Sequence, residues 1–199
     1  MSRHKYFTAI ILAAGISSRM GRPKQLLKVD GSTMIDHAIQ AALDAGMDSP
    51  IVVLGANANQ IKSSSRLLCR CTVIKNTNYR EGLSRSLKSG LQSTPAQTTA
   101  YIFMLADQPL ISGRLVLQMI QEFNKTRADI LYPEYQGQRG NPVIISSKLR
   151  NRLLLAEGDS GAKFLFTDNS LSIVPYPINT DAVITDIDTP EDYKNICKR

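Results

Sequence analysis

The sequence has no tryptophan, and its 199 residues include only three cysteines and two histidines. The cysteines, Cys69, Cys71 and Cys197, form no Cys-x-x-Cys pair, and an odd number of cysteines cannot all pair within one chain. His4 and His37 have no neighbours in sequence that would complete a metal site or a catalytic set. We therefore expect reduced thiols and no covalent catalysis by a Ser/His/Asp or Cys/His arrangement.

Long apolar runs are also missing. No stretch has the length and apolarity of a membrane-spanning helix, and the N-terminus lacks a signal peptide's apolar segment and cleavage site. We therefore expect a cytoplasmic protein with no membrane partner, folded as a single domain over residues 1–199. The net charge is +7, but the basic residues are scattered and aromatics make up only 6%. This pattern disfavours nucleic-acid binding and suits small, highly charged phosphate compounds.

The most informative stretch follows a predicted first strand, residues 6–13. Its apolar run ends at small residues, and a loop rich in glycine, serine and cationic side chains continues to Lys24. Small residues let backbone N–H groups approach a phosphate, and Arg19 and Lys24 supply positive charge. The spacing does not match a P-loop, because five residues separate Gly15 from Gly21 and no Gly-Lys-Ser/Thr follows. The Gly-x-Gly-x-x-Gly dinucleotide fingerprint is also absent.

The loop itself carries a resemblance. The stretch Leu12-Ala13-Ala14-Gly15-x-Ser17-x-Arg19-Met20-Gly21-x-x-Lys24 resembles the signature loop of MobA-like nucleotidyltransferases, and most closely that of the molybdenum cofactor cytidylyltransferases. The resemblance continues along nearly the whole chain. It implies nucleotide binding by Leu12, Ala13, Ala14, Gly15, Ser17, Arg19, Gly21 and Lys24, with Arg19 and Lys24 acting on the reacting phosphates.

Strands alternate with helices along the chain, which predicts βαβ units and a mostly parallel sheet. We expect a single-domain, Rossmann-like α/β fold with helices on both faces, as in nucleotide-diphospho-sugar transferases. The expected strands are residues 6–13, 50–55, 71–75, 101–106, 129–133, 141–145, 171–176 and 182–187, with an extended piece at 25–29. The expected helices are residues 34–43, 57–67, 82–91, 113–124 and a last one after Thr189. Their expected N-terminal caps are Ser32 or Thr33 for the first, Asn57 or Asn59 for the second, Ser112 for the fourth and Thr189 for the last. The strands 129–133 and 141–145, joined by a glycine turn, predict a small β-ribbon over the active edge of the sheet.

A second segment suited to nucleotide binding begins near Asn78. The helix predicted over residues 82–91 is rich in glycine and serine, which are poor helix formers and so suggest another purpose. Its small N-terminal residues could admit a flat base close to the backbone. The resemblance places Gly82 and Ser86 beside that base, while leucines on another helical face pack in the core.

Carboxylates follow two late segments of the chain. The most apolar strand, residues 101–106, is expected at the sheet centre and ends at Asp107, where open α/β sheets bind ligands. Mg²⁺ prefers carboxylate oxygen and commonly bridges protein to phosphate. The resemblance implies that Asp107 and Asp188 hold this metal and that Asp107 takes part in catalysis. Asp186 is the reserve candidate for the second ligand, because it lies two residues earlier on the same side of the predicted strand.

The resemblance alone indicates which residues would bind the second substrate, the acceptor of the transferred nucleotide. Gly140, Asn141 and Pro142 form one matching segment, and Gly158, Asp159 and Gly161 form another. An ordinary helix start capped by Asp159 or Ser160 explains the residues of the second segment nearly as well as acceptor binding does.

Together these segments predict nucleotidyl transfer, in which an acceptor phosphate attacks the α-phosphorus of a nucleoside triphosphate. The resemblance implies CTP as donor, molybdopterin-type cofactor as acceptor, Mg²⁺ as metal, and a molybdoenzyme or its chaperone as a partner that could receive the product. Guanylyl transfer stays open, although the resemblance implies that GTP-using relatives carry a second glycine in this loop where this chain has Ala14. Cytidylyl transfer to a sugar or polyol phosphate, an NAD(P)H-dependent oxidoreductase and a non-catalytic nucleotide sensor are further alternatives.

Overall fold

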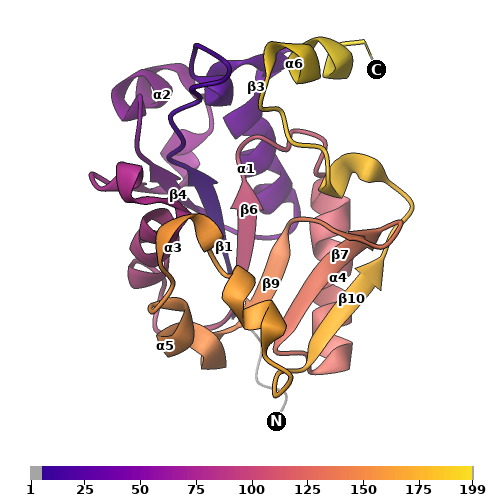
Figure 1. Cartoon of the computed structure of the whole chain (residues 1–199). Helices are drawn as coiled ribbons and strands as arrows, with labels where there is room; N and C mark the ends of the chain where they lie inside the picture. Colours follow the sequence, from indigo (N-terminus) through magenta and orange to yellow (C-terminus); the bar gives the residue numbers. More distant parts are fainter. Residues whose placement is uncertain (1–5, 199) are drawn as a thin grey trace.

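The computed structural model describes residues 6–198, which form one main sheet with helices on both faces (Figure 1). The strands of the main sheet follow the order β10-β7-β9-β6-β1-β4-β5, with β8 paired to β7. The strands are β1 (Tyr6–Ala13), β2 (Lys28–Val29), β3 (Ser32–Thr33), β4 (Ile51–Leu54), β5 (Thr72–Lys75), β6 (Thr98–Leu105), β7 (Ile130–Tyr135), β8 (Gln138–Arg139), β9 (Val143–Ser146) and β10 (Ile173–Pro177). The predicted Rossmann-like α/β fold is confirmed.

Helices cover the two faces of this sheet in Figure 1. The helices are α1 (Met34–Asp44), α2 (Ala58–Ser64), α3 (Leu83–Gln92), α4 (Gly113–Thr126), α5 (Arg150–Leu153) and α6 (Pro190–Ile196). Successive residues of β1 divide between the faces, because side chains alternate along a strand. Ile11 belongs to the core that includes residues of α1 and α4, whereas Ile10 belongs to the core that includes residues of α3 and α5. None of the helices within residues 6–198 is long and apolar enough to cross a membrane.

Three helix starts follow the predicted capping chemistry, whereas Asn57 forms no side-chain cap at α2. The Thr33 side chain accepts a hydrogen bond from the backbone of Asp36 at the start of α1, and Ser112 does the same at α4. Thr189 and Asp192 form a capping box at α6, with Pro190 at the first helical position. Each side chain satisfies an N–H group that the helix itself leaves unpaired.

Three local predictions were wrong. Residues 143–146 do not belong to a ribbon outside the sheet: β9 is inserted antiparallel between β6 and β7, and only the short β8 folds back on β7. Residues 182–187 are not a strand but a single 3-10 turn, Asp181–Val183, followed by irregular chain. Residues 24–26 form another 3-10 turn, so the expected extended piece at 25–29 shrinks to β2. Alternating apolar residues cannot distinguish an outer ribbon from an inserted strand, because both bury one face.

Candidate active site

The loop after β1 is held in shape by Gln25. This side chain is only 2% exposed, and its Nε2 donates to the backbone oxygens of Ala13 (3.3 Å) and Gly15 (3.1 Å). Ser17 has a left-handed backbone with φ of 60°, and its hydroxyl accepts from the backbone N–H of Lys24 at 3.2 Å. These bonds close the predicted phosphate loop on itself. Sequence reasoning missed Gln25, although a glutamine directly after the predicted cationic residue was visible.

Four of the predicted residues meet at one edge of this loop. The Lys24 ammonium lies 2.5 Å from Asp107 Oδ2 and 2.6 Å from Asp188 Oδ1, so it bridges the two carboxylates. The Arg19 guanidinium contacts the other oxygen of Asp188 at 2.7 Å. Lys24 is therefore largely buried although it follows a polar loop: its side chain is 12% exposed, against 68% for Arg19.

The charges in this cluster perturb one another. Burial alone would lower the pKa of Lys24, but the charge and hydrogen bond of Asp107, joined by those of Asp188, raise it above its ordinary value. Burial of Asp188 would raise its pKa, yet the hydrogen bond and charge of Lys24 and the charge of Arg19 outweigh it and hold that pKa below the ordinary value. The ammonium and the Asp188 carboxylate thus keep their charges at neutral pH.

Asp186 lies in a different environment from Asp188. Gln108 Nε2 donates to Asp186 Oδ1 at 2.7 Å and to the backbone oxygen of Val183 at 3.1 Å. Burial raises the pKa of Asp186, and the nearby charge of Asp107 raises it further. Among the described contacts it is Asp188, and not Asp186, that shares Lys24 with Asp107.

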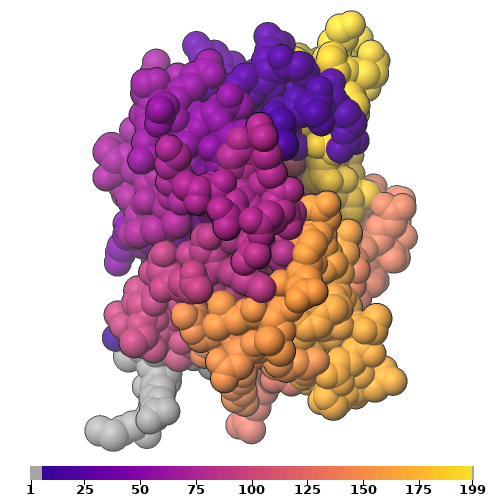
Figure 2. Space-filling model, turned by 60° about the vertical axis from the view of Figure 1, so that its left-hand side comes forward, coloured from indigo at the N-terminus to yellow at the C-terminus, as the bar shows by residue number. Residues whose placement is uncertain are grey.

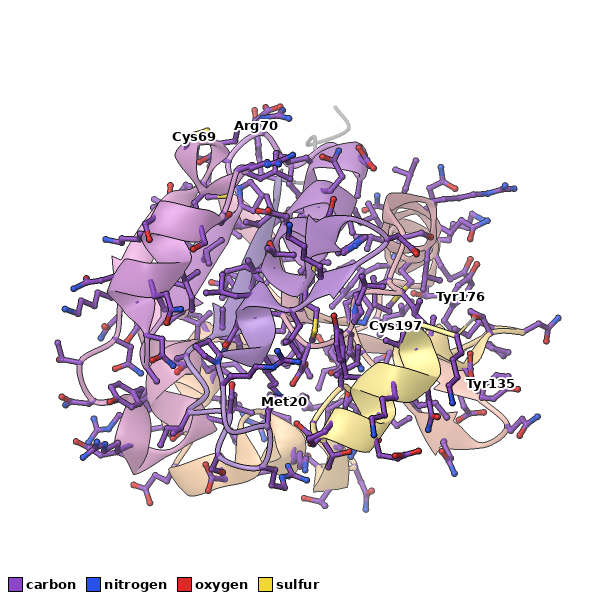
Figure 3. All side chains as sticks on the ribbon, turned by 90° about the horizontal axis from the view of Figure 1, so that it is seen from above. Met20, Cys69, Arg70, Tyr135, Tyr176 and Cys197 are labelled. Atoms are coloured by element: carbon purple, nitrogen blue, oxygen red, sulfur yellow. The ribbon has the colours of Figure 1, made fainter. Side chains whose placement is uncertain are left out.

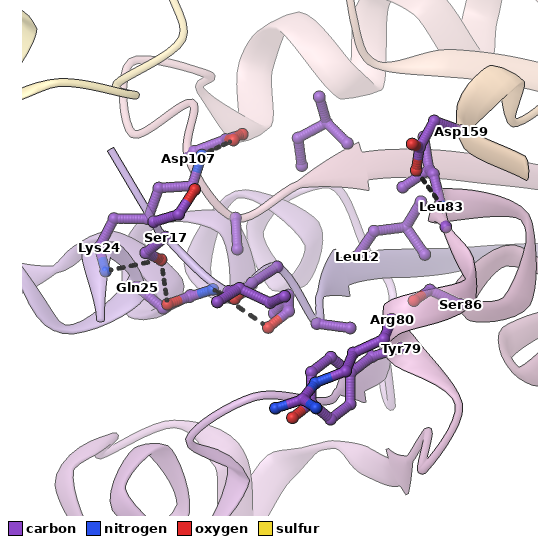
Figure 4. Close-up of a pocket in the computed structure, with 18 residues that line it drawn as sticks. Leu12, Ser17, Lys24, Gln25, Tyr79, Arg80, Leu83, Ser86, Asp107 and Asp159 are labelled. Atoms are coloured by element: carbon purple, nitrogen blue, oxygen red, sulfur yellow. Dashed lines mark hydrogen bonds and ion pairs between the residues drawn. The ribbon is translucent and has the colours of Figure 1, made fainter. Parts of the chain in front are cut away.

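A cavity of about 380 Å³ opens beside this cluster. Figure 4 shows Lys24 and Asp107 on one side and Tyr79, Arg80 and Ser86 on the other. Its lining comprises Leu12, Ala13, Ala14, Gly15, Ile16, Ser17, Ser18, Lys24, Gln25, Tyr79, Arg80, Gly82, Leu83, Ser86, Leu105, Ala106, Asp107 and Asp159. Most predicted nucleotide-binding residues therefore share one cavity, while Arg19 and Gly21 lie outside its lining.

The far wall of this cavity is formed by the N-terminus of α3 and the segment around Gly158, which lie against each other in Figure 2 (magenta and orange). Gly82 has φ of 101°, and a Cβ there would come within 2.5 Å of the Gly158 backbone. Glycine is therefore required by chain packing as well as by conformation. The side chain of Asp159 accepts from the backbone N–H of Leu83 at 3.1 Å. Asp159 thus bonds to the first residue of α3. Its expected role as the cap of a following helix is wrong, because residues 158–160 form only a 3-10 turn.

A second cavity, of about 610 Å³, adjoins the first and shares Leu12, Leu83 and Leu105 with it. Its other lining residues are Leu87, Phe103, Gln138, Arg139, Gly140, Asn141, Val143, Ile145, Ser160, Gly161, Ala162, Lys163, Phe166 and Asp186. Of the predicted acceptor residues, Gly140, Asn141 and Gly161 line this second cavity, Asp159 lines the first, and Pro142 and Gly158 line neither. The guanidinium of Arg139 lies 3.9 Å from the centre of the Phe166 ring, which gives the largely apolar cavity a cationic rim.

The protein alone offers few metal ligands here. Within residues 6–198 no group of three or more His, Cys, Asp or Glu side chains is arranged to hold a metal ion. However, the buried Oδ1 of Asp107 has no hydrogen-bond partner. A buried carboxylate oxygen without a partner suits a divalent cation completed by oxygens of a phosphate ligand.

Comparison with known proteins finds curated relatives and solved structures that match nearly the whole chain. The chain is 28% identical to nicotine blue oxidoreductase of Paenarthrobacter nicotinovorans, covering 92% of this chain and 93% of that protein. It is 29% identical to the molybdenum cofactor cytidylyltransferase of Escherichia coli, covering 92% of each. The crystal structure of Rv0371c from Mycobacterium tuberculosis H37Rv superposes with a TM-score of 0.88 at 26% identity, over 98% of this chain and 99% of that one. A further structure of that protein, in complex with manganese, superposes with a TM-score of 0.80 at 25% identity, over 96% and 98%.

The family model of the MobA-like NTP transferase domain matches residues 9–173. This span runs from β1 into β10 and so includes the loop, Asp107, the lining of the first cavity and that of the second except Asp186. Asp188 lies beyond it. The chain belongs to the MobA-like NTP transferase family and is a nucleotidyltransferase of that family.

Proposed function

We propose that this protein transfers CMP from CTP to a phosphate group of a molybdopterin-type cofactor and releases pyrophosphate. The observation that carries the proposal is the Lys24 ammonium held between Asp107 and Asp188 at the edge of the smaller cavity. A lysine and two carboxylates beside a loop suited to binding phosphate can stabilise the charges of a reaction at a phosphorus atom. The similarity to the cytidylyltransferase of E. coli supports the choice of donor and acceptor.

In this proposal the base occupies the end of the smaller cavity near Gly82 and Ser86, and the phosphates lie along the loop toward Lys24. An acceptor phosphate oxygen attacks the α-phosphorus in line, the bond to the β-phosphate breaks, and pyrophosphate leaves with its electron pair. Lys24 and Arg19 offset the negative charge of the reacting phosphates. Mg²⁺ held by Asp107 and Asp188 would neutralise charge on the α-phosphoryl group. Asp107 Oδ1, which lacks a partner, is the oxygen best placed for that ion.

The larger cavity suits a flat, fused-ring acceptor. The buried Leu87, Phe103 and Ile145 in its lining offer apolar surface for the ring faces, while Gln138, Asn141, Ser160 and Asp186 offer polar partners. Arg139 and Lys163 at its rim suit the anionic groups of an acceptor. The two cavities adjoin, so an acceptor in one could reach a nucleotide in the other.

Pyrophosphate release tests the proposal. Each of the four NTPs is supplied with Mg²⁺, with and without molybdopterin-type cofactor and with a panel of sugar and polyol phosphates. We expect release only with CTP and the cofactor, and Asp107→Asn should lose it while staying folded. Pyrophosphate release with GTP and the cofactor, but with no other NTP, would replace the proposal with guanylyl transfer. Nucleotide binding without any pyrophosphate release would indicate a sensor.

One alternative from another class has direct support. The similarity to nicotine blue oxidoreductase spans nearly the whole chain, so an oxidoreductase on this fold is the second candidate. It requires a reductant such as NAD(P)H, whose binding fingerprint the sequence lacks. Oxidation of NAD(P)H by the purified protein in the presence of a quinone-like dye, with no pyrophosphate from any NTP, would favour this candidate.

A further inference from the structure

Asn76 is a buried polar residue to which the proposed reaction gives no role. It directly follows β5 and is 5% exposed. Its Oδ1 accepts from the backbone N–H of Asn78 at 2.9 Å. Since a backbone N–H can only donate, the amide oxygen must face Asn78, and the amide nitrogen must point the other way. That nitrogen donates to the hydroxyl oxygen of Ser86 at 3.1 Å.

This chain of bonds occupies one of the two lone pairs of the Ser86 hydroxyl and leaves its proton available to a ligand. Ser86 lies on α3, is 3% exposed, and lines the smaller cavity. Its oxygen already accepts from Asn76, and its hydroxyl donates to no residue among 6–198. A buried hydroxyl whose hydrogen has no acceptor within the protein favours a ligand that supplies one, because leaving that hydrogen without a partner costs free energy.

We propose that Asn76 is a positioning residue that holds the Ser86 hydroxyl as a hydrogen-bond donor toward N3 of the bound base, and so selects cytosine over uracil. The proposal rests on the proposed function, which places a cytosine beside Ser86. Cytosine and uracil have nearly the same shape, but N3 of cytosine is an acceptor, whereas N3 of uracil carries a hydrogen. A fixed donor therefore pairs with cytosine and faces a second donor in uracil.

The variant Asn76→Asp reverses this arrangement with almost no change in size. Both oxygens of the new carboxylate accept, so the bond from Asn78 is kept while the Ser86 hydroxyl must donate to the carboxylate. Ser86 then presents a lone pair to the base, which suits uracil. Dissociation constants for CTP and UTP, measured by calorimetry with Mg²⁺, should show the preference for CTP falling by roughly 10- to 100-fold. General damage to the site would weaken the binding of CTP and UTP by the same factor and leave the ratio of their dissociation constants unchanged.

Three further variants separate the proposal from a structural effect. Ser86→Ala removes the donor without adding charge, and it should bring CTP and UTP toward equal affinity even if Asn76→Asp folds poorly. In the Ser86→Ala background, Asn76→Asp should leave the CTP-to-UTP ratio unchanged, since the group through which it acts is gone. Ser84→Ala is the matched control: Ser84 is buried on the same helix, does not line the cavity, and should leave the ratio as in the unmodified protein.

The outcomes distinguish this inference from the proposed function. If the unmodified protein prefers CTP over UTP but Asn76→Asp leaves the ratio unchanged, the role of Asn76 is refuted and the proposed function stands. An unchanged ratio in Ser86→Ala refutes it in the same way. If the unmodified protein binds purine nucleotides better than CTP, both the proposed function and this inference fail.

Discussion

Lys24→Met removes the ammonium between Asp107 and Asp188 while keeping a side chain of similar length. Each ion pair has a gross attraction of about 4 kcal/mol at an effective dielectric constant of about 20. Most of that attraction offsets the cost of burying the ammonium, and the Asp188 side chain is 31% exposed and partly screened by water. We therefore expect a net loss of about 1–3 kcal/mol in the free energy of unfolding, because two carboxylates are left facing each other.

Thermal unfolding at neutral pH measures this loss. For a chain of this size the expected fall in Tm is roughly 3–10 °C without divalent cations. Mg²⁺ or Mn²⁺ should raise the Tm of Lys24→Met more than that of the unmodified protein, because the cation takes the place of the ammonium. Lys28→Met is the matched control: Lys28 is exposed on the short β2, so its loss removes the same charge and should change Tm little.

Two results would refute the reasoning. A Tm for Lys24→Met equal to that of the unmodified protein would mean that the bridging ammonium contributes nothing to stability. A Tm that falls but does not respond to divalent cations would mean that Asp107 and Asp188 cannot hold a metal together. The second result would also remove the basis for the metal in the proposed mechanism.

Three further predictions follow from the site and its surroundings. Ala14→Gly removes a methyl group that lines the nucleotide cavity, so kcat/KM for GTP relative to CTP should rise roughly tenfold, and an unchanged ratio would contradict the placement of the base. Asp159→Ala removes the acceptor for the Leu83 N–H and should lower the free energy of unfolding by about 1 kcal/mol in a denaturant titration, while Asp159→Asn should lose less. Burial, with the neighbouring Cys69, raises the pKa of the Cys71 thiol to about 11, so only about one molecule in a thousand carries the reactive thiolate at pH 8. Iodoacetamide at that pH should modify the exposed Cys69 and Cys197, which lie far apart in Figure 3, and spare Cys71, as peptide mass mapping would show, with Cys71 labelling increasing as the pH approaches 11.

The sequence predicted those parts of the fold that depend on local chemistry. Apolar runs predicted β1, β4, β5, β6 and β7 closely, and Thr33, Ser112 and Thr189 correctly predicted three helix starts because capping involves only near neighbours. The place of β9 in the sheet was not predictable in this way, since strand order is decided by packing between distant segments.

In the candidate site, too, the sequence predicted local chemistry but not contacts between distant segments. The residues that meet at the loop were identified from their chemistry and from the resemblance, but their mutual contacts were not. Nothing in the sequence indicated that Lys24 would be nearly buried between two aspartates, or that Asp159 would bond to α3. Both facts depend on contacts between segments that lie far apart in the chain. Their roles in catalysis and binding stay predictions until the variants above are measured.

The distance in sequence between the partners of Lys24 has a consequence for biosynthesis. Arg19 and Lys24 lie 169 and 164 residues before Asp188, and Lys24 lies 83 residues before Asp107. A chain emerging from the ribosome therefore exposes its cationic loop long before either carboxylate is available to it. Asp188 arrives with α6, whose Tyr193 hydroxyl donates to the backbone oxygen of Lys28 at 2.7 Å. The cluster is thus among the last features to form, so a chain that stalls before α6 could complete most of its sheet yet would lack the completed charge cluster.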